Sequence, residues 1–267
     1  MQQTGNMKKL KVIISGGGTG GHIFPALAIA KAIENKVEDV EFLFVGAEDR
    51  MEMEKIPAAG YKIVGLWISG LQRNLSSRNL LFPFKVMSSL LKARKIVKQF
   101  KPDLAIGTGG YASGPLLFAA AKKGVPSLIQ EQNSYPGITN KILSKYVQKV
   151  CVAYDNMERF FGNENLIITG NPIREDILGF DTKVEKGRKH FNIDASKPTV
   201  LVVGGSLGAR TINNAIAENI EGFKTTDVNL IWQTGISFQA KSKEIIKSVN
   251  VPGIQAHTFI KEMDLAY

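Results

Sequence analysis

The sequence is poor in cysteine and has no long apolar run. Cys151 is the single cysteine among 267 residues, which excludes an internal disulfide and a disulfide-stabilised miniprotein. No stretch of about 18 apolar residues occurs, so a membrane-spanning helix is not expected. The first residues contain no apolar segment before a cleavage site, so we expect no secretory signal peptide. These absences predict a protein of the reducing cytosol.

Motifs for metals and for activated nucleophiles are also missing. Of the three histidines, His190 and His257 have no metal-ligand spacing to any other residue. Zinc-protease helices, paired cysteines, the nucleotide-binding loop with a terminal lysine and the serine nucleophile elbow are all absent. We therefore expect neither a bound metal nor a cofactor.

Acidic residues are absent from one long stretch. The whole chain carries 34 Lys and Arg against 24 Asp and Glu, a net charge of +10. Residues 55–102 contain ten basic residues and no acidic one, so this stretch accounts for the entire excess. A cluster of one sign attracts an anionic partner, which can be a nucleic acid, an anionic lipid surface or a phosphorylated substrate.

Residues 67–85 add apolar side chains to that positive charge. The run lacks a clean helical or strand period and contains Pro83. Aliphatic side chains surrounded by cations favour a bilayer surface with anionic head groups over a nucleic acid. Ordinary core packing with solvated lysines is the simpler alternative. The expected membrane patch comprises Trp67, Leu71, Arg73, Leu75, Arg78, Leu81, Phe82 and Lys85.

The sequence is rich in short apolar runs that end at glycines and alternate with amphipathic helices. This alternation predicts α/β architecture with parallel sheets and helices on both faces. The pattern fades over residues 180–197 and restarts at residue 199, which predicts two Rossmann-like domains, residues 8–170 and 171–267. The second contains only three expected strands, at residues 199–203, 228–233 and 254–258, so we expect it to be incomplete. Strands of the first domain are expected at residues 10–15, 40–45, 61–66, 103–106, 126–130, 149–153 and 165–169.

Four loops follow the ends of expected strands, where open α/β sheets bind ligands. They are residues 16–22, 107–115, 131–134 and 204–210. Their glycines let the backbone approach a phosphate or a sugar, and the helices that follow offer free N–H groups. The first loop also matches the dinucleotide fingerprint, with Glu48 or Asp49 available for a ribose, which leaves a nicotinamide-dependent oxidoreductase open.

Two residues of these loops are candidate proton acceptors. His22 stands at the start of the helix after the first glycine loop, where an imidazole can act as a general base; capping of its own loop is the alternative. Glu131 follows a buried strand, is difficult to explain as a cap, and can serve as an acid, a base or an acceptor for a sugar hydroxyl. Both remain candidates for the base.

Six segments, taken in chain order, resemble one family. GGGTGGHIFPALAIA, GTGGYASGP, EQNSYPGITNK, GNPIR, GGSLGAR and FIKEM are similar to the MurG family of bacterial cell-wall N-acetylglucosaminyltransferases, and the similarity runs from about residue 8 to residue 267. The resemblance implies a metal-independent, two-domain GT-B fold. It also implies inverting transfer of N-acetylglucosamine from UDP-N-acetylglucosamine to the 4-hydroxyl of the muramyl unit of undecaprenyl-linked lipid I, which yields lipid II.

The resemblance further implies site residues and partners. His22 corresponds to the family's proposed base, and Glu131 lies in the acceptor cleft. Peripheral docking on the cytoplasmic face of the bacterial membrane, on inner-leaflet anionic lipids and with no nucleic acid, is expected. Family members continue past residue 267, so a partly encoded donor site is expected, with an inactive fragment as the alternative. Expected donor contacts are Thr19, Gly20, Gly21, Asn133, Arg174, Ser206 and Ile260, and expected acceptor-cleft residues are Gly110, Tyr111 and Ser113.

Overall fold

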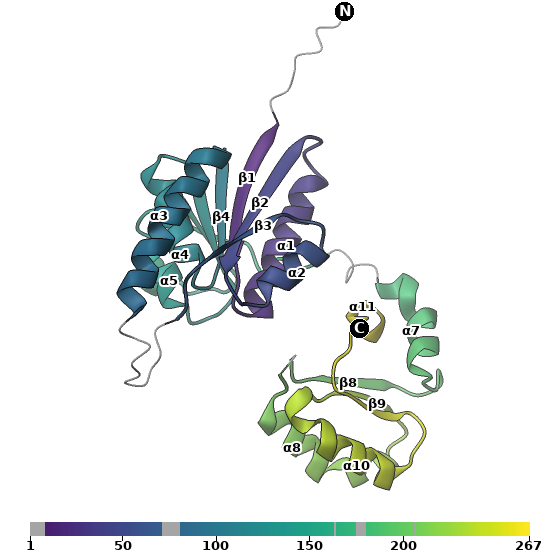
Figure 1. Ribbon diagram of the computed structural model, residues 1–267. Coiled ribbons are helices and arrows are strands. Elements are labelled where there is room, and N and C mark those ends of the chain that lie inside the picture. Colours follow the sequence, from purple (N-terminus) through teal and green to yellow (C-terminus); the bar gives the residue numbers. More distant parts are fainter. Residues whose placement is uncertain (1–8, 71–80, 163, 175–179, 206) are drawn as a thin grey trace, which may run out of the picture. The chain divides into compact units, whose positions relative to one another are not determined.

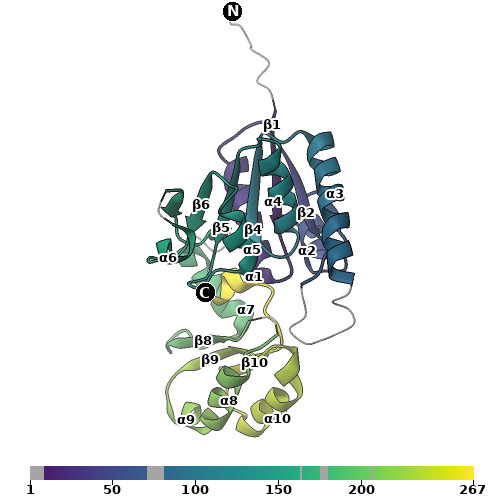
Figure 2. The same ribbon diagram turned by 90° about the vertical axis from the view of Figure 1, so that its left-hand side faces the viewer.

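The computed structural model describes residues 9–70, 81–162, 164–174, 180–205 and 207–267. The chain forms two compact units, residues 1–174 and residues 175–267, each with its own sheet (Figures 1 and 2). Within the described residues, no helix combines the length and the apolar character needed to cross a membrane.

The first unit is built on a seven-stranded parallel sheet with the order β3-β2-β1-β4-β5-β6-β7. The chain starts in the middle of this sheet, builds one half, and then crosses over to build the other half beside β1. The strand order therefore reverses between β1 and β4, and the carboxyl ends of such a pair are where open parallel sheets bind ligands. The strands are β1 (Leu10–Gly16), β2 (Val40–Ala47), β3 (Ile63–Leu66), β4 (Leu104–Gly109), β5 (Ser127–Glu131), β6 (Lys149–Val152) and β7 (Leu166–Ile168).

Helices cover both faces of this sheet. In Figure 1, α3, α4 and α5 lie on one face, and α1 and α2 lie on the other. Successive side chains of a strand point to opposite faces, so Ile13 packs into the cluster under α3 and α4, whereas Ile14 packs against α1. The helices are α1 (Gly20–Glu34), α2 (Glu52–Ala58), α3 (Phe82–Phe100), α4 (Ser113–Lys122), α5 (Ile138–Leu143) and α6 (Glu158–Phe161).

The α/β architecture with two parallel sheets is confirmed. Helix α1 begins at Gly20, because the Thr19 carbonyl accepts the N–H groups of His22 and Ile23 and closes a first turn on the glycines. This places His22 in that first turn. Helix α2 was not predicted, since its seven residues include Pro57 and are too few to show a helical period.

The second unit has a three-stranded parallel sheet with the order β10-β9-β8. Trp232 fills its core and donates from Nε1 to Asn213 Oδ1 at 3.0 Å, while Asn213 Nδ2 donates to the Thr234 carbonyl at 2.7 Å. These bonds tie helix α8 to the end of β9. The elements are α7 (Val184–Phe191), β8 (Thr199–Val203), α8 (Arg210–Glu218), α9 (Ile220–Thr225), β9 (Asn229–Gln233), α10 (Gln239–Val249), β10 (Ile254–His257) and α11 (Met263–Ala266).

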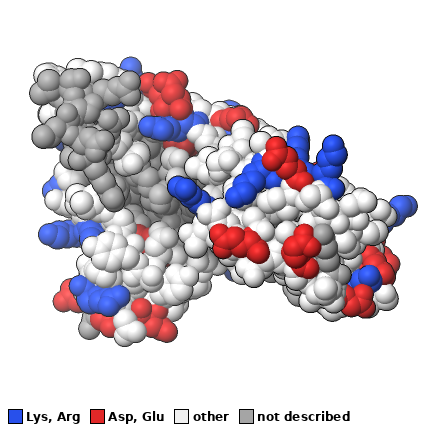
Figure 3. All heavy atoms as spheres, turned by 90° about the horizontal axis from the view of Figure 1, so that it is seen from below, with Lys and Arg blue, Asp and Glu red and all other residues white. Residues whose placement is uncertain are grey.

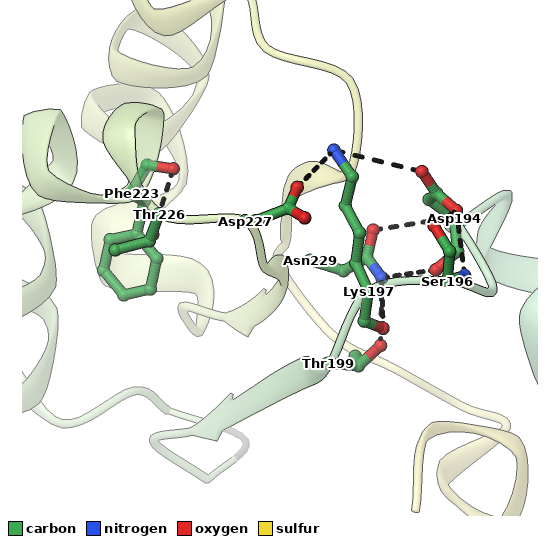
Figure 4. A network of polar contacts seen from close by, with 8 residues as sticks. All are labelled: Asp194, Ser196, Lys197, Thr199, Phe223, Thr226, Asp227 and Asn229. Atoms are coloured by element: carbon green, nitrogen blue, oxygen red, sulfur yellow. Dashed lines mark hydrogen bonds and ion pairs between the residues drawn. The ribbon is translucent and has the colours of Figure 1, made fainter.

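A polar network fixes the start of this second sheet (Figure 4). Asn229 is 1% exposed; its Oδ1 accepts the Asp194 N–H at 3.2 Å, and its Nδ2 donates to the Asp194 carbonyl at 2.9 Å and to Thr199 Oγ1 at 3.2 Å. Lys197 forms an ion pair with Asp227 at 3.0 Å. Strand β8, which leads into the glycine loop at residues 204–208, is therefore anchored at its beginning.

Candidate functional site

A cleft of about 1070 Å³ opens in the first unit, at the carboxyl ends of β1, β4 and β5. Its walls come from the loop between β1 and α1, the loop between β4 and α4, the segment between β5 and α5, and the start of α3. Its volume lies just above the usual range for ligand sites, about 300–1,000 Å³. The cleft therefore accommodates a ligand as large as a sugar with an attached diphosphate.

Glycines bring the first two loops into backbone contact. Gly109 and Gly110 have φ values of +103° and +91°. A Cβ on Gly110 would collide with the Gly17 carbonyl oxygen, and a Cβ on Gly109 would lie 2.7 Å from His22 Cδ2. The Gly17 N–H also donates to the Gly109 carbonyl at 3.3 Å. Only glycine fits at these positions, because both the dihedral angles and the available space exclude a side chain.

His22 is held in one orientation by the glycine loop. Its Nδ1 lies 2.9 Å from the Gly17 carbonyl oxygen and 3.5 Å from Thr19 Oγ1. A carbonyl only accepts hydrogen bonds, so we assign the proton to Nδ1 and the lone pair to Nε2. The half-buried ring lines the cleft. An imidazole in this tautomer is ready to accept a proton at Nε2.

Glu131 also lines the cleft, but its carboxylate is occupied. The side chain is 2% exposed and accepts four hydrogen bonds. The donors are Asn133 N at 3.0 Å, Asn133 Nδ2 at 2.9 Å, Gly137 N at 3.1 Å and Asn140 Nδ2 at 2.9 Å. A base must offer a free lone pair to its substrate, so this arrangement favours Glu131 as the organiser of the segment that follows β5, and His22 as the base.

Several expected site residues meet in the cleft. Thr19, Asn133, Gly110 and Tyr111 line it. The Tyr111 ring lies directly on Gly70, where any Cβ would collide with it, and it remains 47% exposed. Their convergence follows from the parallel sheet, which brings loops distant in sequence to one edge.

Three expected residues lie at helix starts in this unit and do not line the cleft. Ser113, expected in the acceptor cleft, does not line it; the side chain is fully buried and donates to the carbonyls of Ser15 at 2.9 Å and Gly109 at 2.8 Å. Its hydroxyl therefore fastens the second glycine loop to β1. Gly20 and Gly21 form the first turn of α1 and do not line the cleft.

The remaining donor-contact candidates occupy other positions. The Arg174 guanidinium lies over the Phe24 ring, 5.0 Å from its centroid. In the second unit, Ile260 is 3% exposed and donates its backbone N–H to Gln233 Oε1 at 2.9 Å. Ser206 lies outside the described residues.

Half of the expected membrane patch also borders the cleft. Trp67, Leu81, Phe82 and Lys85 line it, and Lys85 Nζ donates to Ser69 Oγ at 2.9 Å while lying 5.5 Å from the Trp67 ring centroid. The other members of the patch, Leu71, Arg73, Leu75 and Arg78, lie outside the described residues.

Exposed apolar residues continue from this border along α3. Phe84, Met87 and Leu91 are 67%, 59% and 57% exposed, and α3 contains no acidic residue. Figure 3 shows Lys and Arg side chains beside Asp and Glu side chains on the face that it draws. The helix thus joins positive charge, of which Lys92 is paired with Glu48, to exposed apolar surface.

Sequence reasoning missed residues that follow β2. Arg50 lines the cleft, and the rule that ligand contacts follow strand ends could have found it. The acids considered for a ribose do not reach the glycine loop: Glu48 pairs with Lys92 at 2.9 Å, and Asp49 is exposed in a left-handed conformation with φ +58°. The acid at the loop is Glu52, whose two oxygens are already bonded to backbone N–H groups. The nicotinamide reading is therefore not favoured.

Comparisons with known proteins support the family resemblance that the six sequence segments indicate. Residues 12–152 match the glycosyltransferase family 28 N-terminal domain, and residues 199–267 match its C-terminal domain. The chain is 54% identical over 258 residues to the UDP-N-acetylglucosamine--N-acetylmuramyl-(pentapeptide) pyrophosphoryl-undecaprenol N-acetylglucosamine transferase of Christiangramia forsetii, covering 97% of this chain and 69% of the relative. The relative of the same name from Cytophaga hutchinsonii is 54% identical over 260 residues, with the same shares covered.

Two solved structures are similar to this chain over nearly its whole length. MurG of Acinetobacter baumannii superposes with a TM-score of 0.67 at 29% identity, covering 97% of this chain and 69% of that one. The UDP-GlcNAc 2-epimerase of Neisseria meningitidis, solved with UDP-GlcNAc bound, has a TM-score of 0.66 at 14% identity and covers 97% of this chain and 74% of its own. The second likeness shows a shared fold alone.

Proposed function

Because the chain belongs to glycosyltransferase family 28, we propose that it transfers N-acetylglucosamine from UDP-N-acetylglucosamine to undecaprenyl-pyrophosphoryl-N-acetylmuramyl-pentapeptide, in peptidoglycan synthesis. The observation that carries the proposal is His22, whose Nε2 lone pair is available in a cleft of about 1070 Å³. The relatives at 54% identity carry the name of this activity.

The reaction requires one proton acceptor. The muramyl 4-hydroxyl lies against His22 Nε2, which takes its proton as the oxygen bonds to C1 of the donor sugar. The bond between C1 and the diphosphate oxygen breaks in the same step, and UDP leaves with the electron pair. Attack opposite the leaving group turns the α-linked donor into a β-linked product. A positioned general base typically contributes a factor of about 10²–10⁴ to such a step.

The departing UDP carries negative charge that must be stabilised. Helix N-termini that follow glycines provide N–H groups and positive potential, and each unit has such a helix, α1 in the first and α8 in the second. Arg174 is a cationic candidate for the same diphosphate. Donors and dipoles that are already oriented need no reorganisation as the charge develops.

The lipid-linked acceptor explains why the cleft and the apolar surface meet. Trp67 and Leu81 line the cleft and are also 44% and 50% exposed. A polyprenyl chain can leave the cleft across these residues and enter a bilayer that they touch. We place this surface on the cytoplasmic face of the membrane, against anionic lipids, as a peripheral contact.

Transfer itself tests the proposed function. The chain, and the chain joined to the part of the Christiangramia forsetii relative that it does not match, are given labelled UDP-N-acetylglucosamine and a short-chain acceptor analogue. We expect at least one of the two proteins to form a labelled product that a β-N-acetylglucosaminidase cleaves. Neither protein should form a labelled product from the 4-deoxy acceptor. Absence of transfer by both proteins, or equal transfer to the 4-deoxy analogue, would contradict the proposal.

Flotation with lipid vesicles tests the membrane contact. We expect binding to anionic vesicles, weakened by added salt because screening shortens the reach of exposed charges. Glu substitutions at Arg73, Arg78 and Lys85 should reduce the bound fraction more than Glu substitutions at Lys241, Lys243 and Lys247 in α10, the control with the same change in charge. Equal binding to neutral and anionic vesicles, or binding to neither, would remove the anionic-lipid partner.

A further inference from the structure

Glu52 is a fully buried acid beside the glycine loop. It lies in the first turn of α2, and its side chain is 0% exposed. Its Oε2 accepts the N–H of Gly18 at 2.8 Å, and its Oε1 accepts the N–H of Ala47 at 2.9 Å. One carboxylate therefore joins the loop after β1 to the end of β2. Bonds to a charged acceptor are about twice as strong as neutral ones.

The same side chain fills the space next to Gly17. A Cβ on Gly17 would collide with the Glu52 carboxylate, while a Cβ on Gly110 would collide with the Gly17 backbone. The Gly17 peptide is thus clamped between Glu52 and Gly110. This peptide supplies the carbonyl that bonds to His22 Nδ1.

From these contacts we propose that Glu52 is a positioning residue for His22. By holding Gly17 and Gly18 it fixes the carbonyl that keeps the proton on His22 Nδ1, so that Nε2 stays available as an acceptor in the cleft. Glu52 itself does not line the cleft, and both its oxygens are used within the protein. Its catalytic consequence rests on the proposed function, whereas its effect on the imidazole does not.

The imidazole can be observed directly, because the chain has three histidines. Long-range ¹H–¹⁵N spectra of the ¹⁵N-histidine-labelled 267-residue protein report which ring nitrogen carries the proton, and His22→Gln assigns the signals. We expect the Nδ1–H form for His22 in the unmodified protein. An Nε2–H form there would overturn the inference without any variant.

Glu52→Gln keeps the size of the side chain but replaces one acceptor oxygen with an NH₂ group. Because an NH₂ group only donates, the side chain can no longer accept from both Gly18 N–H and Ala47 N–H. We expect the ratio of the Nδ1–H form to the Nε2–H form to fall about tenfold, as the loss of one well-placed hydrogen bond allows. Glu54→Gln is the matched control, since Glu54 is on the same helix but exposed and paired with Lys55 at 2.8 Å. An unchanged ratio in folded Glu52→Gln would also overturn the inference.

Kinetics separate positioning from a general loss of structure. In the transfer assay, Glu52→Gln should lower kcat about 10–100-fold and leave the KM for the donor within threefold. The reason is that the affected atom, His22 Nε2, acts on the acceptor hydroxyl. In a His22→Ala background, Glu52→Gln should lower kcat no further, since the two residues act as one unit. Independent losses that multiply would show a merely structural role. Full transfer by His22→Ala with a shifted tautomer in Glu52→Gln would instead refute the base while leaving the positioning intact.

Discussion

Transfer by the His22→Ala variant is expected to fall by roughly two to four powers of ten, the range for removal of a general base. UDP-N-acetylglucosamine binding should stay nearly unchanged, because the ring is assigned to the acceptor hydroxyl and its Nδ1 is bonded to the protein's own Gly17. The measurements are kcat with the lipid acceptor analogue and calorimetry with the donor.

His190→Ala provides the control, since His190 lies in α7 of the second unit and is exposed. A loss smaller than tenfold for His22→Ala, about 1.4 kcal/mol in barrier height, would assign the base to another group. Glu131 would then be the next candidate, although its four hydrogen bonds to the segment after β5 argue against it.

Gly110→Ala is expected to lower transfer at least about 100-fold, as misplacement of a site by about 1 Å does. The new Cβ would collide with the Gly17 carbonyl, the group that orients His22. It would also strain a backbone with φ +91°, at a cost of about 1–2 kcal/mol. The loop must move to relieve the collision, and His22 moves with it.

Gly124→Ala separates the collision from the strain. Gly124 also has a positive φ, +73°, but nothing lies within 4 Å of the position of its Cβ. Both variants are compared in free energy of unfolding and in transfer rate. We expect both to be destabilised and only Gly110→Ala to lose transfer; equal rates in the two variants would show that the contact between the two glycine loops does not position the site.

The short apolar runs, together with the glycines that end them, were sufficient to predict the strands. The run TVLVV before Gly204 and the run LKVIIS before Gly16 both form parallel strands. A short apolar run that is followed by a glycine loop and a helix is typical of a buried strand. Helix α2 could not be predicted in this way. Its residues are stabilised by contacts made at a distance, through buried Glu52 and Ile56, and not by a local period.

His22, Glu131 and glycines of the first two loops, all singled out from the sequence, line one cleft, because strand ends are recognisable and a parallel sheet places them at one edge. The sequence could not decide which acid or imidazole is free to react. Glu131, Ser113 and Glu52 are all polar residues near strand ends, yet the side chain of each is hydrogen-bonded to backbone or amide groups of the protein itself. Sequence thus determined the two α/β units and the loops that form the cleft. Only the tertiary structure decided which polar side chains hold those loops, because hydrogen-bond partners are set by proximity in space.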